Sequence, residues 1–194
     1  MSKNELYPIF LKVSELNILI VGGGNVGLEK LTFLLKSSPN AKVTVLSKIF
    51  IPDLINLAQK HDVETVTGSY NDSILRDKHI VIAATDSIKV NLQVHGDCKE
   101  RNILINVADN PSYCDFYMGS IVTKGNIKLA ISTNGKSPTM AKRLRQFFED
   151  VIPDDINLLS ENLNMYRKKI KGSFEEKVKR MNDITKDMID KKLS

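Results

Sequence analysis

The chain has 194 residues, 42% of them hydrophobic, and a formal net charge of +5, which suits one ordinary domain or a domain with an appendage. No apolar run approaches the roughly 18 residues that a membrane helix needs, and the first five residues lack the apolar stretch of a secretory signal. The two cysteines and three histidines are scattered without metal-ligand spacing. We therefore expect no preformed metal site and a reducing, cytoplasmic location.

A glycine-rich stretch near the start of the chain is the strongest local signal. An apolar run at 17–21 leads into Gly22, Gly24 and Gly27, which have G-x-G-x-x-G spacing, and leucines at helical spacing follow. Gly22 allows a sharp turn, Gly24 lets a pyrophosphate approach the backbone, and Gly27 lets the helix pack close to the strand. The pattern predicts dinucleotide binding at a helix N-terminus. The alternative is a glycine-rich turn without a ligand.

Strand and helix patterns then alternate up to residue 107. The apolar segment 7–11 contains Pro8 and is predicted to lie as an edge strand or arm against the sheet. Apolar strands that alternate with helices predict an α/β fold, a Rossmann-type doubly wound parallel sheet. We expect strands at 17–21, 42–46, 63–66, 80–84 and 103–107, and helices at 25–37, from 52 and at 87–99.

The pattern changes after residue 112. Segments 116–122 and 127–132 predict a β-hairpin, Ser137 and Pro138 open a helix that runs to about 150, and residues 154–190 have helical spacing. The predicted parts are an NAD-binding domain at 1–112, a dimerisation segment at 113–150 and a helical domain at 151–194. A small hairpin cannot easily bury both faces alone, so we expect a homodimer through residues 116–150.

Basic residues are concentrated in the last part of the chain. From Glu161 onward there are ten Lys and Arg against six Asp and Glu, which supplies +4 of the net charge. Nucleic acid could use such charge, but the segment has few aromatic residues for stacking on bases. We favour a solvated helix face and expect no nucleic-acid partner.

Ligands of an open α/β sheet lie beyond the carboxyl ends of its strands. The second strand ends in Ser47, Lys48 and Ile49, where an acidic residue normally holds the ribose of NAD. Backbone and serine contacts could hold NAD here, and Lys48 could accept a 2′-phosphate, which leaves NADP as an alternative.

Two later strand ends carry candidate acid–base residues. Thr85 and Asp86 follow the fourth strand, and Asn106 begins the stretch that leads to Asp109 after the fifth. A carboxylate beside a cofactor can take a proton as a hydride leaves. Asp109 also precedes Asn110 and Pro111, which is typical of a turn without any catalytic role.

Five motifs occur in order along the chain: residues 7–10, the glycine turn, 83–86, 106–111, and 131–138 followed by 141–145. Together they resemble the precorrin-2 dehydrogenase family of siroheme synthesis, which includes the N-terminal part of bifunctional siroheme synthases. The resemblance spans roughly residues 7–150. It implies a homodimer that oxidises precorrin-2 to sirohydrochlorin with NAD, and some members of the family also insert Fe²⁺ as a substrate.

The resemblance also assigns residues. The family's essential aspartate falls on Asp109, and its NAD contacts fall on Asn25, Val26 and residues 47–49. Asp109 is then the base, and in iron insertion it would receive the pyrrole protons while the substrate holds the metal. The many carboxylates of precorrin-2 suit the basic segment after the nucleotide domain. From that segment we select Lys124, Lys136, Ser137 and Arg143 as substrate-binding residues.

Two other functions remain open at this point. One is another NAD(P) oxidoreductase with a small-molecule substrate. The other is a non-catalytic NAD(P)-binding sensor, which would bind the nucleotide without turnover.

Overall fold

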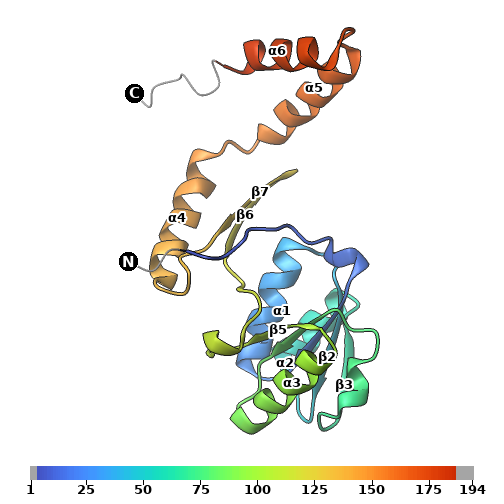
Figure 1. Cartoon of the computed structure of the whole chain (residues 1–194). Helices are drawn as coiled ribbons and strands as arrows, with labels where there is room; N and C mark the ends of the chain where they lie inside the picture. Colours follow the sequence, from blue (N-terminus) through green and yellow to red (C-terminus); the bar gives the residue numbers. More distant parts are fainter. Residues whose placement is uncertain (1–3, 187–194) are drawn as a thin grey trace. The chain divides into compact units, whose positions relative to one another are not determined.

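The computed structural model describes residues 4–186. It contains two compact units, one formed by Met1–Gly119 with Ser132–Pro138 and the other by Ser120–Ile131 with Thr139–Ser194. Of the helices in the described range, none combines the length and apolar character required to span a lipid bilayer. The elements of both units are drawn in Figure 1.

A parallel sheet is the centre of the first unit. Within residues 4–186 it has five strands in the order β3-β2-β1-β4-β5. The chain builds outward from β1 to β3, then crosses to β4 on the other side of β1, so the strand order reverses between β1 and β4. This topology confirms the predicted Rossmann-type α/β fold. The strands are β1 (Asn17–Val21), β2 (Lys42–Ser47), β3 (Glu64–Thr67), β4 (Ile80–Ala83) and β5 (Leu104–Val107).

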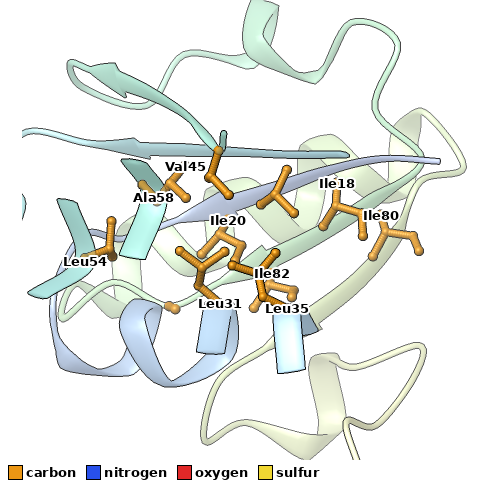
Figure 2. Packing of buried hydrophobic residues seen from close by; sticks show 12 residues of the cluster. Ile18, Ile20, Leu31, Leu35, Val45, Leu54, Ala58, Ile80 and Ile82 are labelled. Atoms are coloured by element: carbon orange, nitrogen blue, oxygen red, sulfur yellow. The ribbon is translucent and has the colours of Figure 1, made fainter. Parts of the chain in front are cut away.

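Helices cover both faces of this sheet. Successive strand side chains point to opposite faces, so Ile18 and Ile20 pack toward α1 (Asn25–Ser37) and α2 (Pro52–Lys60). Leu19 and Val21 join the opposite cluster, to which α3 (Ile88–Glu100) and the 3₁₀ helix η2 (Asp72–Leu75) contribute. Figure 2 shows Leu31 and Leu35 of α1 lying against Ile20 and Ile82 of the strands.

Of the two forms predicted for the N-terminal segment, an edge strand or an arm against the sheet, the edge strand is wrong. Residues 4–12 have no strand assignment, and the first element is the 3₁₀ helix η1 (Val13–Glu15). Tyr7 and Phe10 are exposed. Pro8 has no N–H to donate to a neighbouring strand, which is consistent with the absence of pairing in these residues.

The second unit contains the predicted hairpin. Strands β6 (Ser120–Lys124) and β7 (Ile127–Ile131) pair antiparallel around Gly125. The first strand begins at 120 rather than 116, because Phe116 and Met118 pack instead against the core of the first unit's sheet. The hairpin prediction is confirmed with this shorter first strand.

The C-terminal helices differ from the single helical stretch predicted at 154–190. After α4 (Pro138–Val151) come α5 (Ile156–Lys169) and α6 (Phe174–Thr185), with a break between them. The break has two local causes. Gly172 has a φ of 129°, and Ser173 forms a capping box with Glu176 that starts a new helix. Residues 187–190, including Met188 of the predicted stretch, lie outside the described residues, and the predicted domain boundaries stay predictions.

The buried thiol of Cys98 gives a pH-dependent contribution to stability. Burial raises the pKa of Cys98 from 9.0 to about 12, so above pH 9 the unfolded chain loses a proton that the folded state still holds. The contribution of the protonated Cys98 thiol to the free energy of unfolding is complete below about pH 9 and is lost as the pH rises toward 12. We expect the free energy of unfolding to fall in this window by up to ~1.4 kcal/mol per pH unit from this group.

Urea unfolding between pH 8 and 11 measures this effect. Comparison with Cys98→Ala isolates it, because every other titrating group is common to both proteins. The wild-type protein should lose stability more steeply than the variant. Equal slopes for the two proteins would contradict the assignment to Cys98.

Candidate functional site

The glycine turn joins the carboxyl ends of three strands. Gly22 has a φ of 132°, and a Cβ there would lie 2.3 Å from the carbonyl oxygen of Ala84, just after β4. Its N–H donates to the carbonyl of Leu46 on β2 over 2.9 Å. A Cβ on Gly27 would lie 2.0 Å from the carbonyl oxygen of Gly22, so α1 packs directly on the turn. Any side chain at Gly22 or Gly27 would force these elements apart.

Gly24 has the opposite environment. It is the N-cap of α1, and a Cβ built on it would meet no atom of the described chain within 4 Å beyond its immediate neighbours Gly23 and Asn25. The first hydrogen bond of the helix runs from Leu28 N to Gly24 O over 2.9 Å, so the N–H groups of Asn25, Val26 and Gly27 have no helical acceptor. Open space in front of free N–H groups and the positive end of a helix fits the pyrophosphate of a dinucleotide.

Gly23 is a functional position that the sequence reasoning missed. A Cβ there would lie 2.5 Å from the carbonyl oxygen of Ile49, and the Gly23 carbonyl accepts a 3.0 Å bond from Ile51 N. The close contact seats the loop after β2 against the glycine turn. The available signal was the run of three consecutive glycines, in which Gly23 occupies a variable position of the G-x-G-x-x-G motif.

The loop after β2 is shaped by Ser47. Its hydroxyl donates to the carbonyl of Ile49 over 2.7 Å, and its own carbonyl accepts from Gly68 N over 2.9 Å. Lys48 and Ile49 are exposed, Ile49 to 81%. The loop therefore offers an ammonium group and an apolar side chain at the edge of the sheet, while the Ser47 hydroxyl keeps only its acceptor capacity.

A buried amide fixes the turn after β4. The Thr85 hydroxyl donates to Asn91 Oδ1 over 2.6 Å, and Asn91 Nδ2 donates back to the Thr85 carbonyl over 3.0 Å. Asn91 lies on the buried face of α3 beside Val94. The sequence did not indicate its role, because the apolar residues at helical spacing explained this face of α3 without it. The Thr85 side chain is thus occupied in holding the turn, and Asp86 follows it in an exposed position.

Asp109 is exposed just after β5 and has a φ of 61°. The turn that carries it is closed by a 3.2 Å bond from Asn110 N to Val107 O, and a 2.9 Å bond from Ala108 N to Ala83 O ties it to β4. A positive φ at the third position of a turn favours Gly or Asn. Aspartate also adopts this conformation, as Asp62 and Asp77 do in other turns of the chain.

Asn106 is buried in β5. Its Nδ2 donates to the carbonyl of Phe116 over 2.8 Å, so the amide holds the following chain segment to the strand. The prediction that Asn106 contacts a cofactor stays a prediction.

The basic candidates lie away from the strand ends in sequence, and the structure gives several of them partners. Lys124 forms an ion pair with Asp154 in the second unit and holds the pKa of that exposed carboxyl below its ordinary value. Arg143 donates to Gln146 Oε1 over 3.2 Å on α4. Lys136 is exposed, and Ser137 N donates to Thr133 Oγ1 over 3.2 Å in the loop before α4.

The structure therefore brings one group of predicted residues to the carboxyl edge of the sheet, while Lys124 and Arg143 belong to the second unit. Among residues 4–186, no group of three or more His, Cys, Asp or Glu is arranged to hold a metal ion. The residues at the sheet edge are Gly22, Gly24, Asn25, Val26, Gly27, Ser47, Lys48, Ile49, Thr85, Asp86 and Asp109.

Comparison with known proteins agrees with this geometry. A family model described as putative NAD(P)-binding matches residues 9–120, and a model described as sirohaem biosynthesis protein central matches residues 124–150. The siroheme synthase of Pseudoalteromonas atlantica is 37% identical over 176 residues, which is 91% of this chain. The chain belongs to the family of the siroheme synthase N-terminal part and precorrin-2 dehydrogenase.

Other members of this family support the assignment. The siroheme synthase of Pseudoalteromonas translucida is 38% identical over 168 residues, 87% of this chain. The chain spans only 38% and 35% of the length of these two relatives. A solved structure titled SirC, precorrin-2 dehydrogenase, has the same fold, with a TM-score of 0.73, 21% identity, and coverage of 97% of this chain and 94% of that one.

Two glycines of the turn provide a matched test of cofactor binding. Alanine at Gly24 adds a methyl group to open space and lowers stability by only about 1 kcal/mol, the usual effect of alanine at an N-cap. We expect Gly24→Ala to fold and to bind NAD(P) at least about tenfold more weakly, because the methyl occupies the space that the phosphates need.

Alanine at Gly27 should instead unfold or strongly destabilise the protein, because its Cβ overlaps the Gly22 carbonyl oxygen. Thermal denaturation and calorimetric NAD(P) titration of both variants separate the two effects. Unchanged NAD(P) affinity in Gly24→Ala would place the phosphates elsewhere.

Proposed function

We propose that this protein catalyses the NAD-dependent oxidation of precorrin-2 to sirohydrochlorin. The observation that supports this most directly is the open N-terminus of α1 together with Asp109, an exposed aspartate in a positive-φ conformation at the same edge of the sheet. Family membership supplies the substrate class, because relatives are siroheme synthases and the protein of the same fold is a precorrin-2 dehydrogenase.

In this proposal NAD, when bound, accepts the hydride from the substrate. The chain's own residues bind the cofactor and accept the proton. The N–H groups of Asn25 and Val26 bind the pyrophosphate, and Asp109 takes the proton that leaves the substrate as the hydride departs. The turn from Val107 to Asn110 holds the exposed Asp109 at the sheet edge.

NAD is preferred over NADP in this proposal because the loop after β2 suits an unphosphorylated ribose. Ser47 can accept a hydrogen bond from a ribose hydroxyl, and the exposed Ile49 provides an apolar surface for the adenine ring. Lys48 is the observation that favours NADP as the alternative, since its ammonium could pair with a 2′-phosphate.

Precorrin-2 is bound in this proposal by charge-assisted hydrogen bonds to its carboxylates. Lys136 and Ser137, in the loop before α4, are the proposed partners. The expectations that Lys124, which pairs with Asp154, and Arg143 also bind substrate stay predictions. If Fe²⁺ is also inserted, the tetrapyrrole nitrogens hold the metal and Asp109 receives the pyrrole protons. A cytoplasmic location stays a prediction of the sequence.

A homodimer is part of the proposal because α4 carries an uncovered apolar stripe. Leu144, Phe147 and Val151 recur at three- or four-residue steps on this helix and are exposed. Strands β6 and β7 form a two-stranded sheet within the described residues, and such a hairpin is marginal alone. A second copy of the chain would cover both features.

The overall proposal is tested by mixing the protein with precorrin-2 and NAD and following the absorption spectrum of sirohydrochlorin. Oxidation is the expected result, and no spectral change with either NAD or NADP overturns the proposal. Addition of Fe²⁺ or Co²⁺ then separates a dehydrogenase alone from one that also inserts metal. Nucleotide binding without turnover would identify a sensor.

Asp109 variants distinguish a catalytic role from a turn-forming one. Asp109→Asn keeps a residue that favours the positive φ, so its melting temperature should equal or exceed that of the wild type. Without the basic carboxylate, precorrin-2 oxidation should fall by about a hundredfold or more, while calorimetric NAD affinity stays within about twofold. Retained turnover in this variant would remove Asp109 from the mechanism.

The dimer is tested on α4. Phe147→Asp places a charge in the apolar stripe and should shift the protein toward monomer in sedimentation velocity. Thr139→Asp introduces the same residue at an exposed position of the same helix and should leave the dimer intact. A monomeric wild type, or equal behaviour of the two variants, would contradict the proposed interface.

A further inference from the structure

The outer edge of β5 is closed by side chains rather than by another strand. β5 is the last strand of the sheet, and Leu104 and Ala108 bond inward to the β4 side. The alternate residues Ile105 and Val107 direct their N–H groups outward, to Asp115 Oδ2 over 3.1 Å and to Cys114 Sγ over 3.3 Å. Two adjacent side chains thus satisfy the donors that an edge strand leaves free.

The Cys114 sulfur also spans the turn that carries Asp109. It accepts from Val107 N, and its S–H lies 3.3 Å from both the Val107 and the Asn110 carbonyl oxygens. One thiol therefore contacts the residues at the two ends of the turn, Val107 and Asn110. Burial raises the pKa of Cys114, which keeps the proton that these donor contacts require.

The segment that holds Cys114 is itself anchored to α3 and β5. The Tyr113 ring packs edge-on against His95 of α3, with ring centroids 5.0 Å apart. Asp115 forms an ion pair with Lys99 of the same helix. Asp115 N donates to the Ile105 carbonyl over 2.8 Å. Cys114 therefore reaches the turn from a fixed position.

We infer that Cys114 is a positioning residue that holds the turn from Val107 to Asn110 and so fixes where Asp109 is presented. The inference rests on the proposed function, in which Asp109 is the base. The Cys114 thiol contacts Val107 and Asn110, the first and last residues of the turn, and a turn held at both ends keeps the exposed Asp109 carboxylate at one place on the sheet edge.

A double-mutant cycle tests this role. Cys114→Ala should lower kcat for precorrin-2 oxidation by about tenfold to a hundredfold, as expected when a reacting group is slightly misplaced, while KM for NAD changes less than twofold. The same substitution in the Asp109→Asn background should lower kcat no further. Equal losses in both backgrounds, or a change confined to KM, would overturn the inference.

Two further variants sharpen the result. Cys114→Ser retains a group that can donate and accept, and it should recover much of the lost kcat. Cys98→Ala removes the other free cysteine, which is buried on α3 in the core cluster below the turn and does not take part in the hydrogen bonds that close it, and should leave kcat unchanged. Failure of the serine to recover activity beyond the alanine variant counts against the hydrogen-bonding role.

Amide hydrogen exchange separates this inference from the proposed function. Val107 N–H should exchange faster in Cys114→Ala than in the wild type or in Cys98→Ala, whatever the substrate is. A wild type that does not oxidise precorrin-2 overturns the proposed function through the activity assay alone. Unchanged exchange of the Val107 N–H in Cys114→Ala overturns the inference that Cys114 holds the turn.

Discussion

The approach of α1 to the end of β1 is the constraint on which the rest of the first unit depends. Only the absence of a side chain at Gly27 lets the helix rest on the Gly22 carbonyl, and only the absence of one at Gly22 lets the end of β4 pack there. This contact aims the free N–H groups of α1 across the carboxyl edge of the sheet. In the proposed function, the site for the cofactor phosphates is thus a consequence of how the core is packed.

The same edge presents Asp109 on a turn that is held by its surroundings. Asp109 has a positive φ, which aspartate tolerates and which Asp62 and Asp77 share. The turn is fixed by the Asn110 bond to Val107, the Cys114 contacts and the Asp115 bond to Ile105. In the proposed mechanism these contacts leave the proton acceptor exposed while its backbone stays in place.

The sequence predicted the sheet and its glycine turn because each depends on patterns within a few residues. Apolar strands, helical spacing and G-x-G-x-x-G glycines are local and strong. Asn91 and Cys114 were missed because their partners are set by tertiary contact and no short pattern marks them. The break at Gly172 was missed although its capping box was readable, since the apolar spacing continues across it. The edge strand that was one predicted form of the N-terminal segment is not found in residues 4–12, because apolar residues alone do not specify a pairing partner.

The central claim is that one edge of the sheet holds both the nucleotide and the proton acceptor. Titration of the ¹⁵N-labelled protein with NAD, followed by amide chemical shifts, tests this most directly. The account predicts that the largest shifts fall on Gly24 to Val26, on Ile49, and on the turns at Asp86 and Asp109. Large shifts confined to other surfaces, with the glycine turn and the Asp109 turn unaffected, would contradict it.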